Sequence, residues 1–204
     1  DSVRQPDMPL HIYAISQGAH ITMRMAGDGL GQADTYALIV PMAKIFTGPF
    51  PYAVARLLAG GLAYAGLGEV FAPGRGQWDI ANVEFGSETV CNGNPERPQI
   101  RDALFALDEN KRVEGPTARW VHESMRSTDT LFATNYAAQI SEPVVMFTAG
   151  RDTIVDTDAA AALCDMLGDC ERQHFQASRH CIGLETDEVR AAIIEASLKH
   201  FASE

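Results

Sequence analysis

Residues 10–26 have the pattern of a buried strand that turns sharply into a helix. Residues 10–15 are apolar or aromatic at five of six positions, and this run stops at Ser16. Gly18 follows two residues later, before a segment whose apolar side chains recur as in a helix. This is the layout of a nucleophile elbow, G-x-S-x-G, which places a serine above the end of a sheet. Ala14 stands where the motif has its first glycine, and it is still small enough for close approach of strand and helix.

The elbow alone does not distinguish a catalytic serine from a serine in a well-packed turn. A small residue, a serine and a glycine occur in many strand-to-helix turns. The residues that follow the elbow are more informative. A catalytic elbow is followed along the chain first by an acid after a late strand and then by a histidine just before the last helix. Both groups are present here, in that order.

The candidate acid is Asp152, which follows a strand late in the chain. Residues 143–150 are rich in β-branched and aromatic side chains, as strands are. Asp152 comes at the carboxyl end of this strand, the edge where open α/β sheets bind their ligands. An aspartate that caps the next helix would lie directly before it, where Asp156 and Asp158 stand. We therefore choose Asp152, with Asp156 as the alternative.

The candidate base is His180, in a loop between the last strand and the last helix. Residues 172–176 have the strand pattern, and a helix with one apolar face begins near Thr186. His20 is the nearest competitor because it lies on the helix behind Ser16, but its side chain there would face along the helix. We expect the five other histidines to be solvated or simply hydrogen-bonded: His11, His20, His122, His174 and His200.

Three segments together resemble the α/β-hydrolase superfamily. Residues 14–18, 148–152 and 178–180 look like its nucleophile, acid and histidine segments. Residues 115–124 are similar to a cap segment of bacterial lysophospholipases and monoacylglycerol lipases. The resemblance covers the chain from Leu10 onward. It implies an α/β-hydrolase fold that lacks its N-terminal strands, with a mainly helical cap inserted between core strands.

The resemblance also implies how the chain is divided. Residues 1–40 would form the hydrolase core with the nucleophile, residues 41–142 the helical cap, and residues 143–204 the core with the acid and histidine segments. Helical patterns at 52–64, 98–111 and 118–138 agree with a helical cap.

Aromatic residues of the expected cap are candidates for lining an acyl pocket: Phe46, Phe50, Phe71, Trp78 and Trp120. For each of them a place in the cap's own small core is the simpler interpretation. We choose Trp78 and Trp120 as the substrate-binding candidates.

The chemistry follows from the residue types. A serine hydroxyl is a poor nucleophile at neutral pH, so an imidazole has to accept its proton during attack. His180 would do this and later protonate the leaving alcohol, while Asp152 would orient the ring and stabilise the imidazolium. The backbone N–H of Gln17, directly after the nucleophile, would donate to the oxyanion.

A second oxyanion donor is not found in the sequence. It is often marked by a His-Gly dipeptide, and none occurs here. Only residues 1–8, a mostly polar leader, precede the first strand. The superfamily has four strands and two helices there, roughly a hundred residues. We therefore expect the 204 residues alone to be inactive. We also expect another chain or a second copy to cover the bare edge of strand 10–15.

Composition excludes several classes of protein. A net charge of -11 argues against binding nucleic acids or anionic membrane surfaces. No run of eighteen apolar residues could cross a bilayer. We expect a cytoplasmic protein, with peripheral attachment to the inner membrane face as an alternative.

The four cysteines (Cys91, Cys164, Cys170 and Cys181) are expected to be buried thiols. Together with His174 and His180, the last three invite a zinc hypothesis, but their spacing misses the short pairs of structural sites. A Cys164–Cys170 disulfide is an alternative for a secreted protein, but nothing in the sequence indicates it. We expect no metal and no cofactor.

The sequence thus predicts a serine ester hydrolase that cleaves a monoacyl lipid, a lysophospholipid or monoacylglycerol, through an acyl-enzyme. A small-ester or thioester hydrolase is the alternative within enzymes. A non-catalytic fragment that keeps the hydrolase fold is the alternative outside them.

Overall fold

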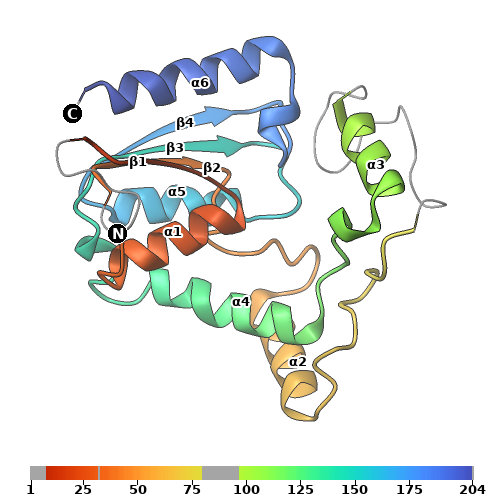
Figure 1. Ribbon diagram of the computed structural model, residues 1–204. Coiled ribbons are helices and arrows are strands. Elements are labelled where there is room, and N and C mark those ends of the chain that lie inside the picture. The colour runs from red at the N-terminus through yellow and green to blue at the C-terminus, as the bar shows by residue number, and fades with distance from the viewer. Residues whose placement is uncertain (1–7, 32, 80–96, 204) are drawn as a thin grey trace.

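The computed structural model describes residues 8–31, 33–79 and 97–203. Four parallel strands form one sheet in chain order (Figure 1): β1 (His11–Ile15), β2 (Thr35–Ile39), β3 (Val144–Ala149) and β4 (Cys170–Phe175). Ile15 pairs with Ile39, and Ile39 pairs with Phe147, so the carboxyl ends of the strands lie along one edge. The predicted α/β class is confirmed.

The two central strands are buried over their whole length. β2 and β3 have no exposed residue, and their sequences are almost continuously apolar. This composition is typical of parallel strands that are covered on both faces. β1 and β4, at the two ends of the described sheet, are partly exposed.

Helices cover both faces of the sheet (Figure 1). α1 (Gln17–Gly27) and α5 (Thr157–Met166) lie on one face, and α6 (Asp187–Phe201) lies on the other. Alternate residues of β2 enter the two cores, because side chains of a strand point to opposite faces in turn. Leu38 packs in the core under α1 and α5, and Ile39 packs in the core under α6.

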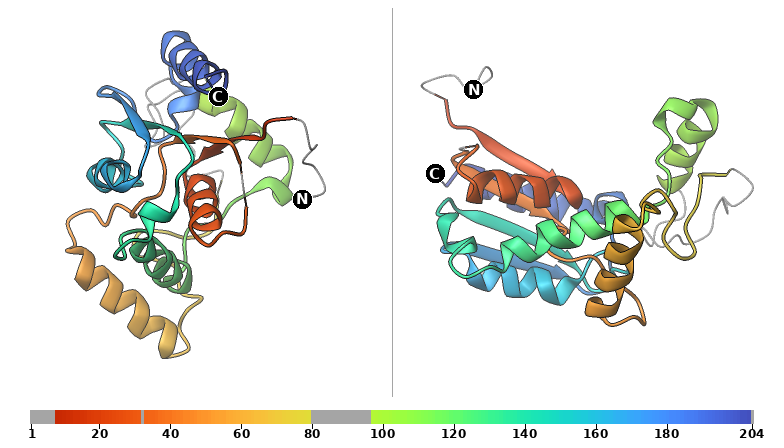
Figure 2. Two further views of the ribbon diagram at one scale, coloured as in Figure 1. Left: turned by 90° about the vertical axis from the view of Figure 1, so that its left-hand side faces the viewer. Right: turned by 90° about the horizontal axis from the view of Figure 1, so that it is seen from below.

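The segment between β2 and β3 is mainly helical, as expected. It contains α2 (Tyr52–Tyr64), α3 (Arg97–Leu107), η2 (Glu109–Lys111), α4 (Ala118–Leu131) and η3 (Ala137–Gln139). The views from the side and from below show α4 running along α1, with α2 beside α4 and α3 further out (Figure 2). The helix expected over 118–138 is interrupted after Leu131, before Asn135 adopts a positive φ of 63°.

β1 has a strand neighbour on one side only within the described residues. Tyr13 and Ile15 of this strand are 45% and 52% exposed, and Ile21 and Met25 of α1 are exposed as well. β4, at the opposite end, carries Glu171, Arg172 and other polar side chains, which blunt a sheet edge against pairing. The two ends of the sheet therefore differ in chemistry.

The prediction of free thiols is wrong. Cys164 and Cys170 form a disulfide with a Cα–Cα distance of 5.5 Å. The last turn of α5 returns directly into the first residue of β4, which brings these two cysteines together despite their short separation. Cys181 is disulfide-bonded too. Cys91 lies outside the described residues.

Among the helices of the described chain, none is long and apolar enough to cross a membrane.

Candidate active site

Ser16 lies at a sharp turn between β1 and α1. Its φ and ψ are 53° and -117°, a conformation that non-glycine residues seldom adopt and that costs on the order of 1–3 kcal/mol. Its N–H donates to the Ile39 carbonyl at 2.8 Å, and its own carbonyl accepts from the Met42 N–H at 3.1 Å. The main chain of β2 and of the loop after it therefore holds the turn in place.

The three residues chosen from the sequence meet in one hydrogen-bonded line. The Ser16 Oγ lies 2.8 Å from Nε2 of His180, and Nδ1 of His180 lies 2.7 Å from Oδ2 of Asp152. They follow β1, β4 and β3 respectively, at the carboxyl edge of the sheet. An ionised Asp152 accepts the Nδ1–H, which leaves Nε2 free to accept the serine proton.

The Asp152 carboxylate is fixed by its own loop. Oδ1 accepts from the backbone N–H groups of Ile154 and Val155 at 2.8 and 3.0 Å, which leaves Oδ2 for His180. Asp156, the alternative acid, is the N-cap of α5 and accepts from the Ala159 N–H at 2.9 Å. Asp152, and not Asp156, therefore contacts His180, and the role of Asp152 as the acid stays a prediction.

Backbone hydrogen bonds hold the His180 loop in place on both sides of the histidine. The Ile182 N–H donates to the His180 carbonyl at 2.8 Å, and the Arg151 N–H donates to the Ser178 carbonyl at 2.9 Å. Cys181, next to the imidazole, belongs to a disulfide. His180 is 8% exposed, so its ring is largely shielded from water.

Gln17 opens α1 directly after the serine. The first N–H groups of a helix have no partner within the helix, and the helix dipole favours negative charge there. The position is suitable for stabilising an oxyanion, and the role of Gln17 stays a prediction.

The two tryptophans chosen for substrate binding are distant in sequence from Ser16, Asp152 and His180, and they contact other residues. Trp78 packs edge-on against Phe105 with ring centroids 6.1 Å apart, and the Arg112 guanidinium lies 4.7 Å from its ring centroid. Trp120 lies in the first turn of α4, where its backbone N–H donates to the hydroxyl oxygen of the N-cap Thr117 at 3.2 Å. Their roles toward a substrate stay predictions.

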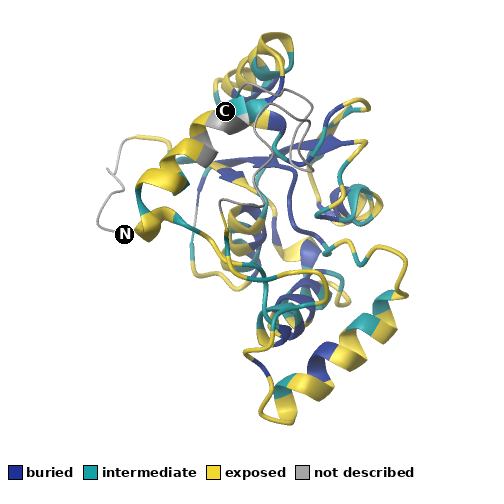
Figure 3. Cartoon of the chain, turned by 90° about the vertical axis from the view of Figure 1, so that its right-hand side faces the viewer, coloured by how far each residue is buried: buried dark blue, intermediate teal, exposed yellow. Residues whose placement is uncertain are grey.

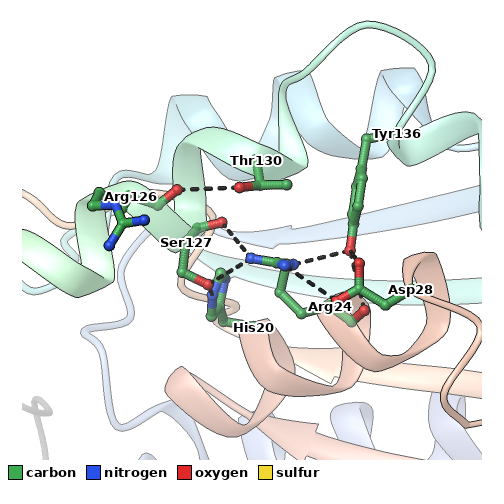
Figure 4. Close-up of polar contacts among 7 residues, drawn as sticks. All are labelled: His20, Arg24, Asp28, Arg126, Ser127, Thr130 and Tyr136. Carbon is green, nitrogen blue, oxygen red and sulfur yellow. Dashed lines mark hydrogen bonds and ion pairs between the residues drawn. The ribbon is translucent and has the colours of Figure 1, made fainter.

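α1, the helix after Ser16, is attached to α4 and to the segment after it by a polar cluster (Figure 4). Arg24 donates to the hydroxyls of Tyr136 and Ser127, both at 2.9 Å, and to Asp28 at 3.1 Å. Tyr136 donates to Asp28 at 2.7 Å. Sequence analysis missed this cluster because more than a hundred residues separate its two sides, and no local pattern marks such a contact.

His20 belongs to the same cluster. Its Nε2 lies 2.8 Å from the Ser127 hydroxyl. Burial, together with the nearby Arg24 charge, lowers the pKa of His20 from 6.5 to about 4, so the ring is neutral at physiological pH. Since Arg24 donates to the same hydroxyl, Ser127 is free to donate its proton to His20.

The expectation that every other histidine is solvated or hydrogen-bonded is wrong for His122. Its ring is 8% exposed, and neither ring nitrogen has a hydrogen-bond partner. The ring lies against Gly60 of α2, where an added Cβ would be 3.1 Å from Nδ1. Close packing against a glycine leaves no room for a partner on that side.

Acidic, histidine and cysteine side chains of the described residues form no group of three or more that could hold a metal ion.

Comparison with known proteins identifies relatives of this chain. A family model described as serine aminopeptidase, S33, matches residues 2–187. The probable lysophospholipase L2 of Haemophilus influenzae is 24% identical over 136 residues, which are 67% of this chain and 42% of that protein. Lysophospholipase L2 of Escherichia coli K12 is 24% identical over 156 residues, 76% of this chain and 44% of that protein. The chain thus spans less than half the length of these curated relatives.

Solved structures show the same fold. A soluble variant of monoglyceride lipase from Saccharomyces cerevisiae superposes with a TM-score of 0.67 at 19% identity, covering 96% of this chain and 62% of that one. A monoacylglycerol lipase from Paleococcus ferrophilus gives 0.67 at 16% identity, covering 93% and 68%. At these identities the likeness establishes the α/β-hydrolase fold.

Proposed function

The chain belongs to the serine aminopeptidase, S33 family of α/β-hydrolases, and from that premise we propose that it is a serine ester hydrolase. The observation that carries the proposal is the line from Ser16 through His180 to Asp152, with distances of 2.8 and 2.7 Å. Nucleophile, base and orienting acid within hydrogen-bond reach are the signature of an activated serine.

In the proposed mechanism the Ser16 Oγ attacks the ester carbonyl while Nε2 of His180 takes its proton. Asp152 holds the ring in the tautomer that leaves Nε2 free, and it stabilises the imidazolium that forms. The Gln17 N–H supports the developing oxyanion. His180 then gives the proton to the leaving alcohol, and a water molecule, activated in the same way, hydrolyses the acyl-enzyme and regenerates Ser16.

We propose a monoacyl lipid as the substrate, either a lysophospholipid or a monoacylglycerol. The relatives described above carry these two activities in their names. α2 supports the proposal: Val54, Leu58 and Leu62 are at least a third exposed on a helix that is largely uncovered (Figure 3). Exposed apolar surface of this kind marks sites of contact with lipids or other proteins. A small-ester or thioester hydrolase is the alternative.

We propose that residues 41–142, which contain α2, α3 and α4, act as the cap over the catalytic residues. α2 would contact the lipid surface by its apolar side chains, because a protein with a net charge of -11 is not attracted to an anionic membrane. The bare edge of β1, with Tyr13 and Ile15 exposed, would be covered by a strand of another chain or a second copy.

The disulfides indicate in which cell compartment the protein would act. The cytoplasm was expected from the sequence, but it keeps thiols reduced, whereas this chain has a Cys164–Cys170 disulfide and a disulfide-bonded Cys181. We therefore propose an oxidising compartment in place of the cytoplasm. Fractionation of the source cells with thiol labelling would test this, since fully reduced cysteines in a cytosolic fraction would contradict it.

The proposed function is tested by hydrolysis assays on the full-length protein. We expect turnover of a lysophospholipid, a monoacylglycerol or both, and loss of turnover in Ser16→Ala. Ser124→Ala serves as the matched control, because Ser124 is a buried serine of α4 away from the catalytic line. Hydrolysis of short esters alone would favour the alternative, and no hydrolysis by a folded protein would support a non-catalytic role.

A further inference from the structure

A groove of about 870 Å³ lies between α2 and α4. Tyr52, Arg56, Gly60 and Tyr64 line it from α2, at intervals of one helical turn. Residues 52–64 span about 18 Å of helix, so the groove runs lengthwise along the two helices. None of the three catalytic candidates lines it.

One end of the groove is positively charged. The Lys44 ammonium lies 5.1 Å from the ring centroid of Tyr52 and 4.8 Å from that of Phe132. In the described part of the chain, no carboxylate forms an ion pair with it. Arg56 pairs with Asp129 at 3.0 Å, and Tyr52 donates to the other oxygen of Asp129 at 3.1 Å. This end of the lining therefore has two cations and one carboxylate, and the carboxylate pairs with Arg56.

The positive charge of this end of the groove is opposite in sign to the net charge of the whole protein. The chain has a net charge of -11, so a lining with an excess cation is a local exception. Apart from the cationic end and Tyr64, the lining consists of Ala53, Leu57, Gly60, Gly61 and His122. A ligand with an anionic group at one end and little charge elsewhere complements this distribution.

The cationic end is attached to both loops of the catalytic site. The Met42 N–H donates to the Ser16 carbonyl at 3.1 Å, and Lys44 follows two residues later, within about 7 Å of Met42 along the chain. The Lys44 carbonyl accepts from the Asp156 N–H at 2.9 Å, in the loop that also carries Asp152. Lys44 is thus held next to the loops that present the nucleophile and the acid.

We propose that Lys44 and Arg56 bind the phosphate of a glycerophosphate head group, so that the substrate is a lysophospholipid in preference to a monoacylglycerol. The inference rests on the proposed ester hydrolase function. A phosphodiester is charged at neutral pH and is bound by lysine as a point charge and by arginine through paired N–H groups. A monoacylglycerol offers only neutral hydroxyls to the same position.

The test compares two substrates with the same acyl chain, decanoyl lysophosphatidylglycerol and monodecanoylglycerol, below their micelle-forming concentrations. Lys44→Met keeps the length of the side chain between the two aromatic rings and removes the charge. We expect it to lower kcat/KM for the lysophospholipid by about 10-fold or more, the usual loss for a charged hydrogen-bond partner. We expect less than about a 2-fold change for the monoacylglycerol, which has no charge to lose.

Two controls accompany the measurement. Lys44→Arg keeps the charge and should retain most of the activity on the lysophospholipid. Lys111→Met removes a lysine that pairs with Asp108 near η2, at 2.9 Å, and should change neither substrate. Raising the salt concentration should weaken lysophospholipid turnover in the wild type more than in Lys44→Met.

The outcomes separate the inference from the proposed function. An equal effect of Lys44→Met on both substrates, or none on either, would overturn the head-group site while leaving the ester hydrolase in place. A wild-type protein that hydrolyses neither substrate, although folded, would overturn the proposed function itself. A wild type that prefers the monoacylglycerol would overturn the head-group site alone.

Discussion

Acidification should destabilise the protein through His20. This side chain is buried on α1, and its pKa falls from 6.5 to about 4 because burial and the Arg24 charge disfavour the imidazolium. Below pH 6.5 the unfolded chain takes up a proton at this position that the folded protein does not. Stability therefore declines as the pH falls from about 6.5 toward 4.

The magnitude follows from the two pKa values. At pH 5.5 protonation of this one group stabilises the unfolded chain by on the order of 1 kcal/mol, and at pH 7.5 by almost nothing. We therefore expect His20 to remove on the order of 1 kcal/mol of unfolding free energy between these pH values. The lower pH stays above the isoelectric point of about 4.9, where association would disturb the measurement.

The assay is urea denaturation of the wild type and His20→Gln at both pH values. Glutamine does not titrate, and its side-chain oxygen can accept from Ser127, as the His20 ring nitrogen does. The wild type should lose on the order of 1 kcal/mol more than His20→Gln. His174→Gln is the matched control, since His174 is an exposed residue of β4, and it should keep the wild-type pH dependence. The same pH dependence in wild type and His20→Gln would refute the reasoning.

Further predictions concern the site and its supports. Asp152→Asn should lower kcat by about 10⁴-fold with little change in stability, because the ring of His180 loses the acceptor that sets its tautomer; a loss below 10-fold in steady-state kinetics would contradict this. Gly27→Ala should destabilise the protein by about 1–3 kcal/mol in thermal unfolding, because a Cβ there would lie 2.5 Å from the Tyr136 ring; Gly18→Ala, with nothing within 4 Å, is its control. Replacing Cys164 and Cys170 together by alanine should cost about 2 kcal/mol, the entropy of a short closed loop, and an unchanged urea midpoint would argue against the disulfide. Ester hydrolysis should favour longer acyl chains by up to about 0.8 kcal/mol per buried methylene, and a flat chain-length series would favour the small-ester alternative.

The hydrogen-bonded line of Ser16, His180 and Asp152 could be predicted because its signals are local. Each residue follows a strand, and strands of a parallel sheet end at one edge, so Ser16, Asp152 and His180 had to approach one another. The choice of Asp152 over Asp156 also rested on a local rule, since a cap lies directly before its helix. The bounds of α2 agreed with the sequence pattern at both ends.

Contacts between distant segments could not be predicted in this way. The link from Arg24 to Tyr136 joins residues 112 positions apart, and nothing near either residue indicates the other. The burial of His122 depends on Gly60 of a different helix. The disulfide of Cys164 and Cys170 depends on how sharply α5 returns into β4. Each of these features is set by packing, which a single sequence does not display.

The central claim is that Ser16 is an activated nucleophile, and covalent labelling tests it most directly. The full-length protein is treated with a fluorophosphonate and digested, and the modified peptide is sequenced by mass spectrometry. We predict a single adduct on Ser16, formed at neutral pH and lost in Ser16→Ala and His180→Ala. An adduct on another serine, such as Ser124 or Ser178, or no adduct on a folded protein that hydrolyses esters, would contradict the account.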